Sequence, residues 1–290
     1  MTPVTNTIYG IEIANCVATG VKVPVDEHVT LNEKLKVLAT ESYAPGELPK
    51  LAYLAIGDLG HRNVRGPNGR SYNTPVDFDP KFAAPYSMIP FVIRFADNDL
   101  TAGERERFAL RREEEHLGRN CIAYYLRRNG MDNVTSRKLL HKPGLEPELY
   151  VPTSDVLNPV HPPIPPSGAT TTSGEFLSSS MLLDLSFSKW DVQELLNVGK
   201  ILYGDEQYAL VSEMMLVFGK DRVITIDTPN GRINFKEVIR ATGAIHISCY
   251  YNIAFNNQGF EHTVDLASAE PLMRGMNVVT VDKDGNQIIP

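Results

Sequence analysis

LTAGERERFALRREEEHLGRNCIAYYLRRNG, the stretch from Leu100 to Gly130, carries the strongest local structure signals in this chain. Thr101 followed three residues later by Glu104 is a capping-box pattern, which begins a helix by satisfying its first free N–H groups. Gly130 supplies the left-handed residue that commonly ends one. Acidic residues stand near the start and arginines near the end, as the helix macrodipole favours. The stretch therefore predicts one long helix over 101–129.

The faces of such a helix would differ. A narrow apolar stripe that includes Leu110 and Leu117 is expected to touch the core along one edge, while the other positions are rich in Arg and Glu. Arg111 stands three residues before Glu114, a spacing at which side chains meet on a helix. We interpret the charged face as a contact between subunits. The residues that would form it are Arg105, Arg107, Arg111, Arg112, Glu113, Glu114 and Glu115.

Composition restricts the possible partners. The 290 residues have a formal net charge of -7, which argues against a general nucleic-acid binder because phosphate contacts need a basic surface. No apolar run reaches the roughly 18 residues needed to span a bilayer, and the N-terminus does not begin like a signal peptide. The three cysteines are far apart and suggest neither a disulfide framework nor a metal site. We expect a soluble protein of a reducing compartment.

Prolines divide the chain. The first 30 residues read as short strands or an extended arm, because Pro3 and Pro24 oppose a central place in a sheet. Four prolines between 75 and 90 predict a second extended segment. The run 158–174 is rich in Pro and then in Ser, Thr and Gly, which is typical of a linker. The predicted parts are an arm-bearing α+β domain at 1–157, the linker at 158–174 and a β-rich domain at 175–290.

The C-terminal part favours sheet. VITID and RINFKEVI flank Asn230-Gly231, and Asn-Gly between β-branched runs is the strongest short hairpin signal. NVVTV and NQII flank a second predicted turn. Ser188 is positioned to cap one amphipathic helix, KWDVQELLNVGKILYG. The predicted class is α+β, with a mixed N-terminal half that holds the long helix and extended arms, followed by a mostly antiparallel β domain with one helix.

Motifs for chemistry are weak. The run EEEH at 113–116 lacks the spacing of HExxH, and GDLGHR at 57–62 lacks the glycine pattern of a phosphate-binding loop. DKDGN at 282–286 has its glycine at the fourth position and not at the sixth, unlike an EF-hand loop. We therefore predict no catalytic, cofactor-binding or metal-binding residue, and no cofactor. A hydrolase with a site between the two domains, near Asp58 and His61, stays as an alternative.

Four short runs suggest a relationship. AIGDLGH at 55–61, PFVIR at 90–94, NDLTAGER at 98–105 and IAYYL at 122–126 occur in an order that resembles a family of uncharacterised virion structural proteins of contractile-tailed bacteriophages. The resemblance covers roughly residues 50 to 130 and implies no active site. It implies a non-enzymatic subunit of the virion, built into the baseplate or into the neck between head and tail.

Proline-restricted arms and a charged helix would suit such a subunit, because an arm with a restricted backbone loses little entropy on binding. The expected partners are other copies of the chain in a ring and other tail or neck proteins, with no direct contact to nucleic acid or membrane. A tail-fibre attachment protein is a further alternative, and it would form trimers.

Overall fold

The structure is a computed structural model that describes residues 3–130, 134–159, 172–228, 231–254, 258–273, 280–281 and 287–288. The chain forms two compact units, each built from separate pieces of sequence. Unit 1 holds Met1–Gly130 and Ser186–Phe260, and unit 2 holds Met131–Leu185 and Glu261–Pro290. Each unit takes residues from both sides of the predicted linker at 158–174, of which residues 160–171 lie outside the described part.

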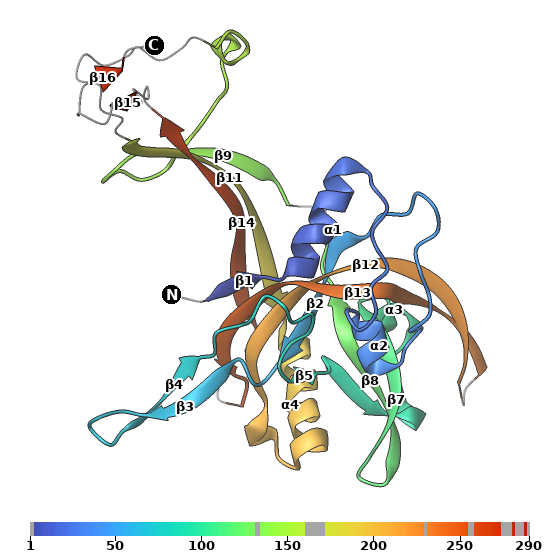
Figure 1. Cartoon of the computed structure of the whole chain (residues 1–290). Coiled ribbons are helices and arrows are strands. Elements are labelled where there is room, and N and C mark those ends of the chain that lie inside the picture. Colours follow the sequence, from blue (N-terminus) through green and yellow to red (C-terminus); the bar gives the residue numbers. More distant parts are fainter. Residues whose placement is uncertain are drawn as a thin grey trace. The chain divides into compact units, whose positions relative to one another are not determined.

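Unit 1 is organised on an eight-stranded antiparallel sheet (Figure 1). The strand order is β1-β13-β12-β2-β8-β6, with β5 paired to β2 and β7 paired to β8. These strands are β1 (Val4–Asn6), β2 (Lys50–Gly57), β5 (Met88–Ile89), β6 (Val92–Phe95), β7 (Phe108–His116), β8 (Arg119–Arg128), β12 (Leu210–Thr228) and β13 (Gly231–Asn252). A separate small hairpin pairs β3 (His61–Arg65) with β4 (Ser71–Pro75).

The hairpin of β12 and β13 dominates the sheet. The two strands pair along almost their whole length, from Leu210 opposite Asn252 to Thr228 opposite Gly231. The predicted Asn-Gly hairpin is therefore confirmed by the pairing, although Asn230 itself lies outside the described residues. Away from the other strands, the hairpin continues and curves past β7 and β8 (Figure 1).

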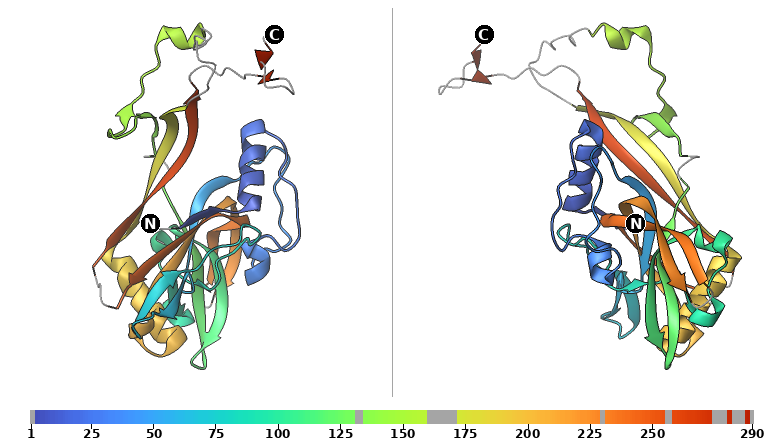
Figure 2. Two further views of the ribbon diagram at one scale, coloured as in Figure 1. Left: turned by 60° about the vertical axis from the view of Figure 1, so that its left-hand side comes forward. Right: turned by 90° about the vertical axis from the view of Figure 1, so that its right-hand side faces the viewer.

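Helices cover parts of this sheet. Figure 2 shows α1 (Ile8–Thr19) and α4 (Lys189–Tyr203) at opposite ends of unit 1. The predicted helix after Ser188 is confirmed as α4, and Ser188 and Asp191 form a full capping box. Residues 8–19 were expected to be extended and form α1 instead, because Thr7 caps the helix and its hydroxyl also donates to Gly243 of β13 at 2.7 Å. The shorter helices are α2 (Leu31–Leu35), α3 (Ala102–Arg105), η1 (Ala96–Asn98) and η3 (Glu206–Tyr208).

The predicted long helix over 101–129 is wrong. The capping box of Thr101 and Glu104 is present, but the helix that it begins, α3, ends at Arg105 after a single turn. The rest of the stretch forms the hairpin of β7 and β8. The α+β class built on that helix is also wrong, since antiparallel sheets dominate the described chain and its helices are short.

Burial explains the strand conformation. Seven consecutive residues, Cys121 to Arg127, are all buried, and a helix on one edge of a core can bury only a stripe. The tight turn of the hairpin lies at Leu117 and Gly118, which have φ of 54° and 70°. Two successive positive φ values are typical of the type I′ turn, whose twist matches that of paired strands. Leu117, expected on the apolar stripe, is 69% exposed at this turn.

The core of unit 1 lies under β2, β8, β12 and β13. Its buried side chains include Ile93 and Leu126 together with Met215 and Val238, so side chains from both predicted halves of the sequence share one core. Phe78, in the proline-rich segment between 75 and 90, is buried and stacks on His246 with ring centroids 4.0 Å apart.

Unit 2 contains a four-stranded sheet of order β10-β9-β11-β14. The strands are β9 (Ser136–His141), β10 (Glu148–Leu149), β11 (Thr172–Phe187) and β14 (Phe260–Met273), and a short helix η2 (Ser154–Leu157) follows β10. The predicted C-terminal hairpin is confirmed as the pairing of β15 (Thr280–Val281) with β16 (Gln287–Ile288), while the DKDGN run at 282–286 lies outside the described residues. No helix in the described part combines the length and the apolar character needed to cross a membrane.

Candidate functional site

The charged run predicted as a subunit contact lies on strand β7. Side chains alternate between the two faces of a strand, so oppositely charged partners lie two residues apart and not three. Arg111 donates from Nη1 to Oε1 of Glu113 at 3.1 Å, and Nη1 of Arg112 lies 3.3 Å from Oε1 of Glu114. The helical pairing of Arg111 with Glu114 is therefore wrong, and the seven residues do not share one face.

Several of the predicted contact residues are used within the chain. Arg105 donates to the carbonyl of Leu100 at 2.6 Å and lies 3.5 Å from Asp99. Arg107 donates to Asp191 of α4 at 2.7 Å. Arg105 therefore holds the turn before α3, and Arg107 connects the segment before β7 to α4.

Glu114 is mostly buried, and its Oε1 accepts a hydrogen bond from the hydroxyl of Tyr125 at 2.7 Å. Its Oε2 is hydrogen-bonded to Nε2 of His116 at 2.8 Å. Glu115 and Glu113 are exposed. Of the predicted contact residues, these two glutamates and the half-exposed Arg112 remain the most accessible on β7.

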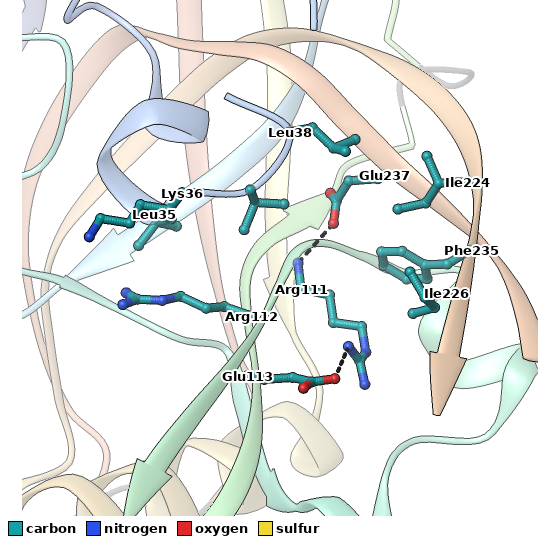
Figure 3. A pocket seen from close by; sticks show the side chains of 11 residues that line it. Leu35, Lys36, Leu38, Arg111, Arg112, Glu113, Ile224, Ile226, Phe235 and Glu237 are labelled. Atoms are coloured by element: carbon teal, nitrogen blue, oxygen red, sulfur yellow. Dashed lines mark hydrogen bonds and ion pairs between the residues drawn. The ribbon is translucent and has the colours of Figure 1, made fainter. Parts of the chain in front are cut away.

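Three of the predicted residues line a groove in unit 1 that has a volume of about 320 Å³. The groove lies between the end of α2, strand β7 and the distal part of the β12–β13 hairpin (Figure 3). Its lining residues are Leu35, Lys36, Val37, Leu38, Arg111, Arg112, Glu113, Ile224, Ile226, Phe235 and Glu237. The volume is at the low end of the roughly 300–1,000 Å³ typical of ligand pockets. It suits a few side chains better than a whole cofactor.

A buried carboxyl group joins two strands beside the groove. Glu237 of β13 is almost completely buried and accepts backbone N–H groups from Leu110 at 2.6 Å, Arg111 at 3.0 Å and Val238 at 2.8 Å. Burial raises the pKa of Glu237 to about 7, although the three N–H donors act in the opposite direction. The carboxyl group therefore has a structural task, holding β13 to β7.

The guanidinium of Arg111 points away from Glu237 and toward Glu113 (Figure 3). Its side chain is only 6% exposed, and its Nη2 lies 3.7 Å from Oδ2 of Asp99. Its Nε has no hydrogen-bond partner among the described residues. Arg111 is thus a buried cation held by two carboxylates, one of them on the exposed face of β7.

The groove has two chemically different sides. Ile224, Ile226 and Phe235 of the hairpin line one side, and Lys36 and Arg112 lie on the opposite side (Figure 3). Lys36 is exposed and forms no ion pair within the described part of the chain. The arrangement can bind a segment that presents aliphatic side chains on one face and carboxylates on the other.

Several of the usual groups of nucleophilic catalysis are absent from the groove, within the described part of the chain. Its lining includes no Ser, Cys, His or Tyr side chain. The described residues also contain no cluster of three or more His, Cys, Asp or Glu side chains arranged to hold a metal ion.

Sequence reasoning missed most of the groove, including Lys36, Ile224 and Phe235. One signal was available: Ile233, Phe235 and Glu237 stand at alternate positions of one strand, so a carboxyl group occupies a position on the apolar face. The remaining residues meet only through the pairing of distant strands.

Asp58 and His61, named for the hydrolase alternative, lie at another place in unit 1. Asp58 accepts a hydrogen bond from Tyr203 and lines a pocket of about 500 Å³ with Tyr203, Tyr208 and Leu210. The ring of His61 packs edge-on against Tyr250, with centroids 5.2 Å apart. No hydrogen bond joins Asp58 to His61 in the part of the chain described, so the two do not form a dyad.

Comparison with known proteins gives a family but no activity. None of the curated proteins compared and none of the solved structures compared matches the chain. The model of one protein family covers residues 1–281, which is nearly the whole sequence. The chain therefore belongs to DUF7208, a family of unknown function.

Proposed function

We propose that this protein is a non-enzymatic structural subunit that assembles with copies of itself. More specifically, it builds the tail apparatus of a tailed-phage virion, at the baseplate or at the neck between head and tail, and its partners are other virion proteins. The sequence resemblance over residues 50 to 130 supports the virion part of this proposal. Nucleic acid and membranes are not among its expected direct partners.

The observation that carries the assembly part is the exposed apolar surface of the N-terminal segment. Five large aliphatic side chains between residues 4 and 25 are 45% to 57% exposed. They are Val4, Ile8, Ile11, Val21 and Val25. Aliphatic side chains gathered within one short exposed segment favour a contact with another protein.

The character of α1 strengthens this argument. Its inner face is buried against β13, where Gly10 comes so close that an added Cβ would lie 2.5 Å from the Cα of Ala244. Its outer face still carries Ile8 and Ile11. That face also holds Glu12 and Asn15, so its apolar part is the pair of Ile8 and Ile11, which another protein can cover. A neighbouring subunit would supply this cover.

The test is the mass of the protein in solution as a function of concentration, measured by sedimentation equilibrium. The wild-type chain is expected to form discrete oligomers, and Ile8→Glu with Ile11→Glu is expected to reduce their mass. Val223→Glu is the matched control, because Val223 is at least as exposed but lies on β12 and outside the N-terminal segment. A wild-type chain that stays monomeric at every concentration would contradict self-assembly.

The virion part has its own test. An antibody against the chain should label the tail or neck region of purified phage particles in electron micrographs. Particles that carry no label, with the protein confined to the host lysate, would contradict it. A purely trimeric mass would favour the alternative of a tail-fibre attachment protein over a ring.

A specific observation supports keeping the hydrolase alternative. The pocket of about 500 Å³ at Asp58 places a carboxylate beside two tyrosines, and Oδ1 of Asp58 is covered but has no hydrogen-bond partner in the described residues. Hydrolysis of ester or phosphoester substrates by the purified protein, lost in Asp58→Asn, would favour the enzyme. Activity that persists in Asp58→Asn would point to a contaminant.

A further inference from the structure

A second exposed apolar segment lies in unit 2, at residues 143–159, which we call the acidic arm. Five of its large aliphatic side chains are 51% to 82% exposed. They are Leu145, Leu149, Val151, Val156 and Leu157. The arm includes β10, which is the edge strand of the four-stranded sheet and therefore has one side free of strand partners within that sheet.

The charged side chains of the arm are all acidic. The sequence contains no Lys or Arg between Lys142 and Lys189, whereas the arm holds Glu146, Glu148 and Asp155. Glu148 pairs with Lys142, and Glu146 has no ion pair within the described part of the chain. The arm thus offers at least one carboxylate that is free to meet a cation.

The residue order of the arm is amphipathic at the period of an extended chain. Leu145, Leu149 and Val151 stand at odd positions, while Glu146 and Glu148 stand at even positions. Side chains alternate along an extended backbone, so Glu148 and Leu149 of β10 face opposite ways, whereas Leu145 lies in the turn before β10, where its N–H donates to the carbonyl of Lys142. A site that received this segment would need an apolar side and a cationic side.

The groove of unit 1 has these two sides. Ile224, Ile226 and Phe235 form the apolar side, and Lys36 lies on the opposite side (Figure 3). Arg112 lies on that side too but is already paired with Glu114, so Lys36 is the cation that remains available there. Its volume of about 320 Å³ fits a few side chains of an extended segment. The match is one of apolar surface and of charge.

From this complementarity we infer that the groove of one copy binds the acidic arm of a second copy. The inference rests on the proposed self-assembly and specifies its contact. The groove and the arm are different surfaces, so the contact is heterologous, and repeated copies close into a ring or continue as a filament. Glu146 meets Lys36, and the aliphatic side chains of the arm cover the apolar side of the groove.

The first experiment maps the contact in the full chain. The photoreactive residue p-benzoyl-phenylalanine replaces Leu145, and irradiated protein is separated by size and analysed by mass spectrometry. Cross-links from Leu145 to residues 35–38 or 224–235 in covalent dimers are expected. The same residue placed at the exposed Leu59 is the control and should give no such cross-link. Cross-links that map elsewhere, or only within a single chain, would overturn the inference.

The second experiment exchanges charges. Lys36→Glu and Glu146→Lys are each expected to raise the dissociation constant of the oligomer by about tenfold, and the double variant is expected to recover most of that loss. Lys50→Glu, at another exposed lysine of unit 1, should leave the constant unchanged. Wild-type oligomers that tolerate both single changes would overturn the inference and leave the proposed self-assembly standing. A monomeric wild-type chain would overturn both.

Discussion

The carboxylate of Glu237 accepts the backbone N–H of Arg111 at 3.0 Å, and this bond joins β13 to β7 beside the groove. The two residues are 126 positions apart in the sequence. The same carboxyl group accepts the N–H of Leu110, a non-glycine residue with φ of 52°. One buried side chain therefore satisfies the backbone at an irregular point of β7, where the strand leaves the core and reaches the groove.

This arrangement predicts a pH dependence of stability. The pKa of Glu237 is raised to about 7 from an ordinary value near 4.5, so the folded state binds this proton more tightly than the unfolded chain does. Its contribution to the unfolding free energy is complete below the ordinary pKa and is lost as the pH rises through about 7. The loss should be at most about 3 kcal/mol.

Urea unfolding at about pH 5 and about pH 8 measures this effect. Glu237→Gln cannot ionise, so the difference in unfolding free energy between the two pH values should be smaller in this variant than in the wild type. Glu115→Gln changes an exposed glutamate on β7 and should keep the wild-type difference. An unchanged pH difference in Glu237→Gln would show that Glu237 does not titrate in this range.

The turn between β7 and β8 predicts a stabilising substitution. Leu117 has φ of 54° and precedes Gly118, and asparagine adopts this left-handed conformation more easily than leucine. Leu117→Asn is therefore expected to raise the unfolding free energy by about 1 kcal/mol. Leu117→Ala, which removes the same exposed side chain without relieving the backbone, is the control. If thermal unfolding showed Leu117→Asn to be less stable than Leu117→Ala, the left-handed backbone conformation of residue 117 would be contradicted.

Replacing either of two helical glycines by alanine is expected to change the stability in opposite directions. An alanine Cβ at Gly10 of α1 would lie 2.5 Å from the Cα of Ala244, whereas a Cβ at Gly103 of α3 would meet nothing within 4 Å. Gly10→Ala should lower the unfolding free energy by about 2 kcal/mol, because β13 cannot yield as a flexible side chain would. Gly103→Ala should leave it unchanged or raise it by up to about 1 kcal/mol. Calorimetry of the two variants checks the pair, and equal effects would contradict the close packing of α1.

Removing the side chain of Asp191 is expected to cause a large loss of unfolding free energy. It completes the capping box of α4 and lies 4.0 Å from Nη1 of the buried Arg127, whose pKa burial lowers to about 10. Asp191→Ala should reduce the unfolding free energy by about 3–5 kcal/mol, because it leaves a buried guanidinium without its carboxylate. Asp205→Ala removes a cap of η3 that forms no ion pair in the described part of the chain, and it should cost about 1 kcal/mol in chemical denaturation. If the two variants lost the same unfolding free energy, capping alone would account for the effect of Asp191→Ala.

Local signals in the sequence were reliable where they concern a few neighbouring residues. The predicted capping box of Thr101 with Glu104 and the predicted cap at Ser188 are both formed in the structure. The Asn-Gly signal correctly predicted the hairpin of β12 and β13. A cap or a tight turn is made by groups within about four residues, so its chemistry can be read along the chain.

The extent of the elements could not be read in the same way. A capping box begins a helix without setting its length, and the Arg- and Glu-rich run after Arg105 has a helix propensity worth only tenths of a kcal/mol per residue. Burial of both faces of β8 outweighs that preference, since each large buried side chain contributes roughly 1.5–3 kcal/mol. Those contacts come from β2, β6 and β7, which the sequence alone does not place beside β8.

The candidate site, too, was predicted from the sequence only where neighbouring residues form it. The sequence singled out the charges of β7, and three of them, Arg111, Arg112 and Glu113, do line the groove. Their neighbours Lys36, Phe235 and Glu237 are brought to them by tertiary pairing alone. The sequence by itself thus determined the caps, the turns and the residue types available. Only the tertiary structure decided which stretch is a strand and which residues share a groove, because burial and long-range pairing carry more free energy than local preference.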